Sequence, residues 1–193
     1  MSDHQFDIAI IGCGPAGLSA AVNAKNKNRD IVVFGTEICS PPMHKAPLIR
    51  NYLGFPSITG EELRQSFLGH ASMLGIEIIK SKADNVFPDE DGYLIISQGN
   101  MVRAKTVIIC TGIPYRHTLQ NEADFLGKGV GYCATCDGPL YRDKDVAIIG
   151  YSEEAEPEAN YLSEICRQVY YLPLYKQEPA VAAKVTVVRE RPL

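Results

Sequence analysis

With 193 residues, the chain is long enough for one large domain or for two small ones with separate cores. Hydrophobic residues make up 46% of it and charged residues 22%, which is typical of a folded globular protein and excludes a disordered one. The net charge of −4 argues against nucleic acid and anionic membranes as partners, because both require a concentrated basic patch. The expected partner is a small molecule or another protein.

The start of the sequence shows no targeting signal. Residues 6–11 already resemble a strand, without the basic and long apolar stretches of a secretory signal, and no segment has the character of a membrane span. Six cysteines in such a chain indicate a reducing compartment, where a close cysteine pair is more often catalytic or metal-binding than structural. We therefore expect a cytoplasmic protein.

The first part of the chain predicts a βαβ unit. A strand at 6–11 leads into a Gly-rich turn at 12–17, an Ala-rich helix continues to Lys25, and a second strand occupies 31–34. The predicted fold class is therefore α/β.

More strands, another helix and a second βα unit follow. Thr59 and Glu62 form a capping box that opens an amphipathic helix, which Gly75 ends. Short strands are predicted at 76–79, 86–87, 93–97, 101–104 and 106–110. The middle three should form an antiparallel meander, and the last is predicted to be buried. A further strand, turn and helix begin at 146–150, and 184–188 is again strand-like.

The turn after the first strand has the spacing of a dinucleotide site. Gly12, Gly14 and Gly17 satisfy G-x-G-x-x-G: the first permits the tight turn, the second lets a pyrophosphate approach, and the third lets the helix pack on the strand. Such glycines can also serve the turn alone, and the pattern does not distinguish FAD from NAD. Glu37 lies at about the distance of a ribose-binding carboxylate, although a solvated turn residue is an equal interpretation.

A cysteine pair is the second candidate site. Cys133 and Cys136 offer two thiols one turn apart, and Asp137 beside them can move a proton to or from a departing thiolate. The alternative is zinc, which needs four ligands, but the four histidines show no ligand spacing and the other cysteines stand alone. We interpret those as small buried hydrophobic residues: Cys13, Cys39, Cys110 and Cys166.

These motifs together resemble the low-molecular-weight thioredoxin reductases over nearly the whole chain. Three blocks are similar to that family's FAD turn, its second flavin-side strand and its active-site segment, at 12–17, 106–112 and 131–138. Besides the three glycines and Glu37, the resemblance implies FAD contacts at Pro15, Ala16, Asn51, Thr111 and Gly112.

The resemblance implies two Rossmann-like three-layer domains of the FAD/NAD(P)-binding class. Residues 1–114 would bind FAD and include the small antiparallel meander, and residues 115–193 would be a degenerate, incomplete nucleotide-binding domain that carries the CxxC dithiol. Cys136 would face the isoalloxazine and receive its electrons, Cys133 would attack the disulfide of a thioredoxin-like protein, and Asp137 would act as acid and base. A homodimer is also implied.

The second dinucleotide turn departs from the family's Gly-x-Gly-x-x-Ala. Ser152 replaces the middle glycine and puts a side chain where a pyrophosphate should approach. The helix start carries charge of the phosphate's own sign at Glu153, Glu154, Glu156 and Glu158. The family's basic stretch for the NADPH 2′-phosphate is replaced by residues 173–175, Pro-Leu-Tyr, which offer no cation. These departures favour the nucleotide-independent branch of the family, with reduced ferredoxin as the donor.

Two further differences lie on the flavin side. Residues 40–42, Ser-Pro-Pro, stand in place of the family's Gly-Gly-Gln, and the sequence contains no Gly-Asp dipeptide, with which complete members finish the FAD domain. We therefore expect the C-terminal return segment to be absent from this sequence.

Three functions are compatible with these observations. The favoured one is a flavoprotein disulfide oxidoreductase, a thioredoxin-disulfide reductase with a donor other than NADPH. The second is an NADPH-dependent thioredoxin reductase with an atypical nucleotide site. The third is a non-enzymatic redox-sensing module that keeps the dithiol on a flavin-type fold.

Overall fold

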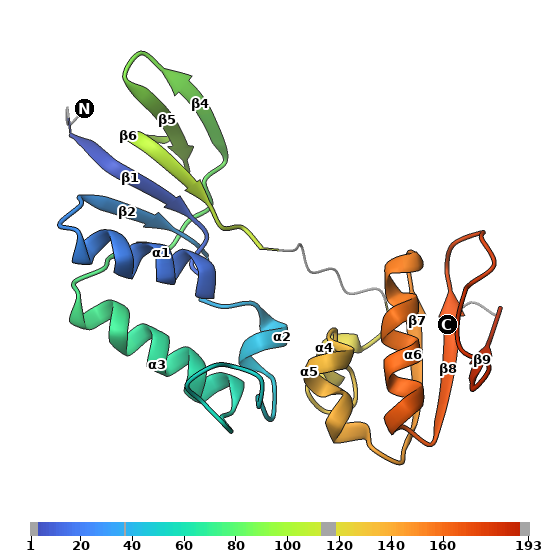
Figure 1. Cartoon of the computed structure of the whole chain (residues 1–193). Coiled ribbons are helices and arrows are strands. Elements are labelled where there is room, and N and C mark those ends of the chain that lie inside the picture. The colour runs from blue at the N-terminus through green and yellow to red at the C-terminus, as the bar shows by residue number, and fades with distance from the viewer. Residues whose placement is uncertain (1–3, 37, 113–118, 190–193) are drawn as a thin grey trace. The chain divides into compact units, whose positions relative to one another are not determined.

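The computed structural model describes residues 4–36, 38–112 and 119–189 (Figure 1). These residues divide into two compact units, one made of residues up to 44 and from 61 to 112, the other of residues 45–60 and 119–189. Each unit has its own sheet and its own hydrophobic core.

The first unit is built on a six-stranded mixed sheet with strand order β3-β2-β1-β6-β5-β4. Its strands are β1 (Gln5–Ile11), β2 (Ile31–Phe34), β3 (Ile78–Ile79), β4 (Asn85–Asp89), β5 (Gly92–Ser97) and β6 (Asn100–Ile109). Strand β6 pairs in parallel with β1 and antiparallel with β5, so it joins the βαβ unit to the meander. The predicted α/β fold class is confirmed by this sheet, in which β3, β2, β1 and β6 are parallel.

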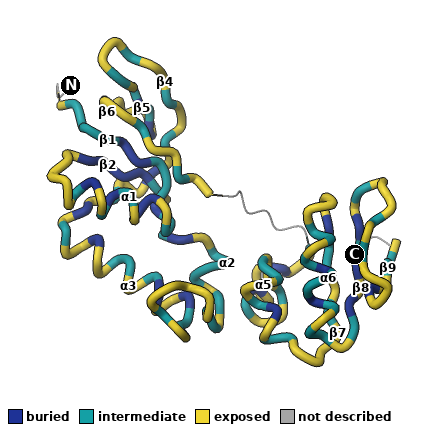
Figure 2. The backbone as a smooth tube through the Cα atoms, viewed as in Figure 1, coloured by how far each residue is buried: buried dark blue, intermediate teal, exposed yellow. Residues whose placement is uncertain are grey.

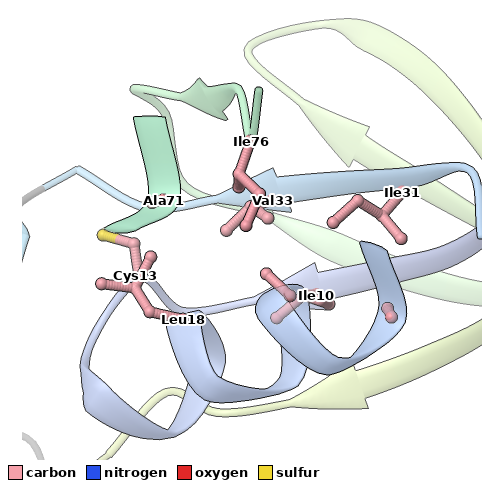
Figure 3. Packing of buried hydrophobic residues seen from close by; sticks show 9 residues of the cluster. Ile10, Cys13, Leu18, Ile31, Val33, Ala71 and Ile76 are labelled. Atoms are coloured by element: carbon pink, nitrogen blue, oxygen red, sulfur yellow. The ribbon is translucent and has the colours of Figure 1, made fainter. Parts of the chain in front are cut away.

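Helices α1 (Pro15–Asn26), α2 (Pro41–His44) and α3 (Gly60–Met73) accompany this sheet. Helix α1 begins with Pro15, whose fixed φ suits the first helical position, and it buries Leu18, Ala21 and Ala24. Neighbouring residues of a strand point to opposite faces. Accordingly Ile10 and Val33 join the α1 side of the core (Figure 3), while alternate strand residues pack on the other face.

The second unit holds a three-stranded parallel sheet with order β7-β8-β9. Its elements are α4 (Glu122–Phe125), α5 (Ala134–Asp137), η1 (Gly138–Tyr141), β7 (Asp145–Gly150), η2 (Glu153–Ala155), α6 (Glu156–Ile165), β8 (Gln168–Pro173) and β9 (Val185–Val187). Helix α6 packs Ala159 and Leu162 against Val169 and Tyr171 of β8. Figure 2 shows the buried residues of β8 and α6 as dark blue segments.

Three expectations about strands and cysteines were wrong. The strands predicted at 101–104 and 106–110 are one continuous strand, β6, and its end is not buried, because Ile109 is 71% exposed. Helix α1 packs mainly over β1 and β2. Cys110 and Cys166 are only partly buried, whereas Cys13 and Cys39 are buried as predicted.

The segment 45–60 belongs to the second unit in this structure, although a boundary near Pro114 assigns it to the first domain. A Cβ atom at Gly127 would lie 2.3 Å from the carbonyl oxygen of Lys45, so the two backbones are in direct contact. Pro114 itself lies outside the described residues. Within the described ranges, no helix is both long enough and apolar enough to cross a bilayer.

Candidate active site

The first glycine turn brings three backbone segments into close contact at the carboxyl end of the sheet. Gly12 has a φ of 118°, and a Cβ atom there would lie 2.1 Å from the carbonyl oxygen of Cys110. A Cβ atom at Gly17 would lie 1.9 Å from the carbonyl oxygen of Gly12. A side chain at Gly17 would therefore block the backbone contact by which α1 packs on the sheet.

Gly14 differs from its two neighbours, because a Cβ atom there would meet nothing within 4 Å. It is the N-cap residue of α1, no side chain caps this helix end, and its first turn contains no acidic residue. The amide groups of a helix N-terminus attract anions. The turn therefore fits the pyrophosphate of a dinucleotide, and Pro15 and Ala16 form the first turn of the helix beside it.

Thr111 and Gly112 follow β6 at the same edge of the sheet. The backbone N–H of Cys110 donates a hydrogen bond of 2.7 Å to the carbonyl oxygen of Ile11, so the ends of β1 and β6 run side by side. Gly112 has a φ of 68°, in the region that favours glycine. Glu37, the predicted ribose ligand, lies outside the described residues.

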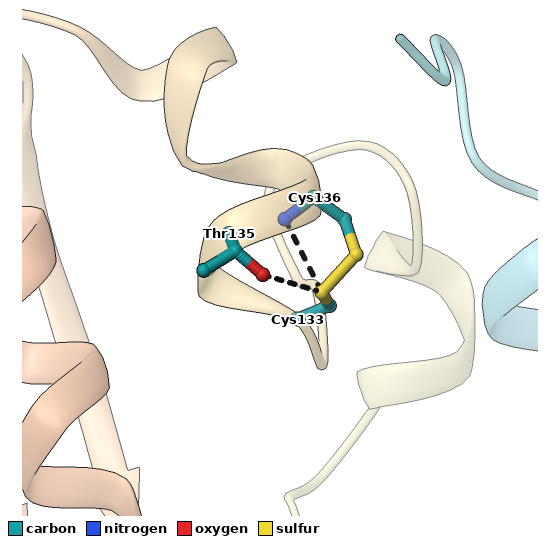
Figure 4. Close-up of a disulfide and its surroundings, with 3 residues drawn as sticks. All are labelled: Cys133, Thr135 and Cys136. Carbon is teal, nitrogen blue, oxygen red and sulfur yellow. Dashed lines mark hydrogen bonds between the residues drawn. A yellow bond between two sulfur atoms is a disulfide. The ribbon is translucent and has the colours of Figure 1, made fainter. Parts of the chain in front are cut away.

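In the second unit, Cys133 and Cys136 are joined by a disulfide, with their Cα atoms 5.2 Å apart (Figure 4). The two sulfur atoms have different surroundings. The Sγ atom of Cys133 accepts a hydrogen bond of 3.2 Å from the backbone N–H of Cys136 and one of 3.4 Å from the hydroxyl of Thr135. Both donors would stabilise a thiolate at Cys133 after reduction.

Asp137 ends the short helix that carries the disulfide, and its backbone N–H donates to the carbonyl oxygen of Cys133 at 3.0 Å. Partial burial raises the pKa of the Asp137 carboxyl above its ordinary value. A carboxyl group with a raised pKa can hold a proton nearer neutral pH, which suits a residue that exchanges protons with thiols. No group of three or more metal-binding side chains occurs among the described residues.

A shallow pocket borders the disulfide on the Cys136 side. Asn51 and Arg50 from the segment 45–60 line it together with Thr135 and Cys136, and its apolar wall consists of Leu48, Pro139 and Leu140. The structure therefore brings Asn51 together with Cys136, 85 positions apart in the sequence. The other residues predicted to contact FAD lie in the first unit.

A tyrosine side chain lies against the first glycine of the second turn. A Cβ atom at Gly150 would lie 2.2 Å from the hydroxyl of Tyr171, which is fully buried. This hydroxyl lies 3.1 Å from that of Tyr175, which donates a hydrogen bond of 2.5 Å to Oε1 of Glu156. Burial and the hydrogen bond to Glu156 raise the pKa of Tyr175, so it stays protonated and keeps donating.

The sequence profile of the pyridine nucleotide-disulphide oxidoreductases matches residues 6–189. The chain belongs to this family. Among curated proteins, the thioredoxin reductase of Ureaplasma parvum is 36% identical over 182 residues, which is 92% of this chain and 59% of that protein. The expected resemblance to thioredoxin reductases, and with it FAD as the cofactor, is confirmed.

Solved structures of family members point the same way. A ferredoxin-flavin thioredoxin reductase from Clostridium acetobutylicum is 45% identical to this chain. The structural alignment covers 98% of this chain and 66% of that protein, with a TM-score of 0.56. The thioredoxin reductase of Streptococcus pyogenes is 28% identical. Its alignment covers 97% of this chain and 64% of that protein, with a TM-score of 0.85. The chain thus spans between about half and two thirds of the length of the proteins it matches.

The sequence did not predict the contacts between residues that belong to different segments of the chain. Arg50 and Thr135 are separated by 85 positions, and nothing in their spacing indicates a shared pocket. The sequence pattern at 173–175 indicated only that Tyr175 lies in a stretch without cations, and it gave no indication of a role for Tyr171. The signal available was a pair of aromatic residues beside a degenerate nucleotide turn, which is too general to predict a hydrogen-bonded chain.

The glycine turn predicts different outcomes for two substitutions. Gly14→Val adds a side chain toward open space, so the variant protein should fold normally. It should lose FAD, because the side chain occupies the position of the pyrophosphate. Gly17→Val should instead destabilise the protein, because its side chain collides with backbone. Flavin absorbance after purification and thermal unfolding measure the two effects. A Gly14→Val protein with the flavin content of the unmodified protein would show that the cofactor binds elsewhere.

The hydroxyl of Thr135 predicts a change in the acidity of Cys133. In the reduced protein, Thr135→Val should raise the pKa of the Cys133 thiol by about one unit, since a hydrogen bond to a charged group contributes about 1.5–3 kcal/mol and one pKa unit corresponds to about 1.4 kcal/mol. Thr135→Ser keeps the hydroxyl and should restore the original value. The ultraviolet absorbance of the thiolate, followed against pH, measures this, and equal curves for Val and Thr would contradict the assignment.

Proposed function

We propose that this chain is a flavoprotein disulfide oxidoreductase of the thioredoxin reductase type that receives its electrons from a donor other than NADPH, such as reduced ferredoxin. FAD would bind at the turn of residues 12–17, and the dithiol of Cys133 and Cys136 would reduce a thioredoxin-like protein. The observation that carries the proposal is the contrast at the middle position of the two turns, where Gly14 leaves open space beside an uncapped helix N-terminus but the second turn has Ser152, followed by Glu153 and Glu154.

The surroundings of the two sulfur atoms support a division of roles. When bound, FAD supplies the electron pair that reduces the disulfide. The Cys133 thiolate then attacks the partner disulfide and forms a mixed disulfide, while the partner's second sulfur leaves as a thiolate that takes up a proton. Cys136 attacks the Cys133 sulfur, which restores the disulfide and releases the second partner thiol. Asp137 is suited to transfer these protons, because its pKa is raised.

The donor assignment rests on the second turn. A bound nucleotide needs close backbone approach and an open helix N-terminus. Ser152 carries a side chain where the family has glycine, and acidic residues occupy the first turns of η2 and α6, among them Glu156, which accepts a hydrogen bond from Tyr175. The similarity to the ferredoxin-flavin enzyme of Clostridium acetobutylicum, at 45% identity, supports the same proposal.

The NADPH-dependent alternative is favoured by the family itself, whose description names pyridine nucleotides, and by matches such as the Streptococcus pyogenes enzyme. The side chains in the second turn argue against it in this chain. A cytoplasmic location, a homodimer and the absence of nucleic-acid and membrane partners stay predictions.

Two electron donors distinguish the proposal from this alternative. NADPH at millimolar excess should fail to reduce the flavin-loaded protein, because the two arginines in the family's basic His-Arg-Arg stretch have no counterpart at residues 173–175. Losing two such contacts at about 1.5–3 kcal/mol each weakens binding by roughly two to four orders of magnitude. Photoreduced ferredoxin should bleach the flavin absorbance. Anaerobic stopped-flow spectroscopy with each donor measures both reactions.

Rapid, saturable bleaching by NADPH would overturn the donor assignment and restore the NADPH-dependent alternative. Bleaching by neither donor would contradict the reductase and favour a redox-sensing module. The flavin-loaded Tyr175→Phe variant is a useful comparison, because it removes the hydroxyl that holds Glu156 but adds no cation for a 2′-phosphate.

A further inference from the structure

The carboxyl group of Asp137 lies directly over the backbone of Gly131. A Cβ atom at Gly131 would be 2.3 Å from Oδ2 of Asp137 and 3.2 Å from its Cγ atom. Carbon and oxygen atoms that are not bonded do not approach so closely, so this position of the carboxyl group requires a residue without a side chain. Gly131 precedes the first cysteine of the pair by two residues, so the same short segment carries the disulfide.

The position over Gly131 keeps the carboxyl group partly buried and away from cations. Burial is the cause that raises the pKa of Asp137, and no described charge lowers it. The facing titratable group is Tyr141 of η1, whose own pKa is raised by burial and by the charge of Asp137. The ammonium of Lys144 lies 5.9 Å from the centre of the Tyr141 ring.

The backbone at Gly131 does not itself require glycine. Its φ lies outside the left-handed region, unlike that of Gly129 at 137°, and the residue is exposed. The obstacle to a side chain is therefore the carboxyl group of Asp137 and not the main chain or a packed core. Alanine at this position should displace the carboxyl group toward solvent while the fold is retained.

We propose that Gly131 is a positioning residue for Asp137: by leaving room for the carboxyl group it holds the proton-transferring residue in a partly buried place beside the disulfide. The proton-transfer role of Asp137 rests on the proposed function, whereas the place of its carboxyl group does not. Reduction of the disulfide to two thiols takes up two electrons, which the reductant supplies, and two protons. The protonated Asp137 carboxyl gives one proton to the departing cysteine thiolate, and the reductant or solvent gives the other.

The test is a titration of Asp137 in the full chain, labelled with carbon-13 at aspartate carboxyls and assigned with an Asp137→Asn variant. In the unmodified protein the Asp137 carboxyl should titrate above the ordinary value of about 3.9. In Gly131→Ala its midpoint should move down toward that value, because the displaced carboxylate is better hydrated. Gly69→Ala is the matched control, since Gly69 is exposed and a Cβ atom there meets nothing within 4 Å.

A second measurement follows the rate at which the disulfide is reduced. With dithiothreitol as the reductant, the rate of disulfide reduction, corrected for ionisation of the reagent, should fall as pH rises through the Asp137 midpoint. This fall should occur at lower pH in Gly131→Ala and at the unmodified position in Gly69→Ala. An ordinary midpoint in the unmodified protein, or an unchanged midpoint in Gly131→Ala, would overturn the inference even if flavin reduction by ferredoxin succeeds. An ordinary midpoint in the unmodified protein overturns the inference even if Gly131→Ala does not fold, because the inference requires a raised one.

Discussion

Backbone contact without intervening side chains at Gly12 and Gly17 is the constraint on which the first unit depends. The carbonyl oxygen of Gly12 lies where a Cβ atom of Gly17 would be, so α1 starts directly on the ends of β1 and β6. This contact aims the N-terminus of α1 at the open space over Gly14, at the edge where parallel strands end. The same contact therefore stabilises the helix and leaves its amide groups available to a pyrophosphate.

The second unit keeps the strand and helix of this arrangement, but Ser152 stands at the position that corresponds to Gly14. Tyr171 lies against Gly150, and the Tyr175 hydroxyl donates a hydrogen bond to Glu156 in the first turn of α6. The acidic side chains in the first turns of η2 and α6 disfavour a second anion there. The two units thus divide the work: the first keeps a place for a dinucleotide, and the second uses its fold to present a disulfide beside a partly buried carboxyl.

The sequence predicted best where a short local pattern determines structure. Strand β2 has the predicted ends, and β1 and α1 begin or end within one residue of the prediction, because the Gly-rich turn and Pro15 define where the strand stops and the helix starts. The helix that follows Thr59 could be predicted equally well, since a capping box is a local sequence signal. The paired cysteines are likewise three residues apart and form the disulfide that this spacing suggested.

Features that depend on distant contacts could not be predicted. Local alternation divided β6 in two, whereas pairing with β5 on one half and β1 on the other makes it one strand. Ile109 looked like a core residue, yet its exposure depends on what covers the strand end. Gly131 resembled an ordinary loop glycine, and its requirement follows only from where the Asp137 carboxyl lies.

The central claim is that the chain has one dinucleotide turn with open space at its middle glycine, and a second turn whose middle position carries Ser152 next to acidic side chains. A crystal structure of the full protein grown with saturating FAD and NADPH tests this most directly. The account predicts a pyrophosphate bound over Gly14, with the Tyr175 hydroxyl still bonded to Glu156 and no nucleotide at Gly150. A nucleotide pyrophosphate bound over Gly150, with the Tyr175 side chain displaced, would contradict it.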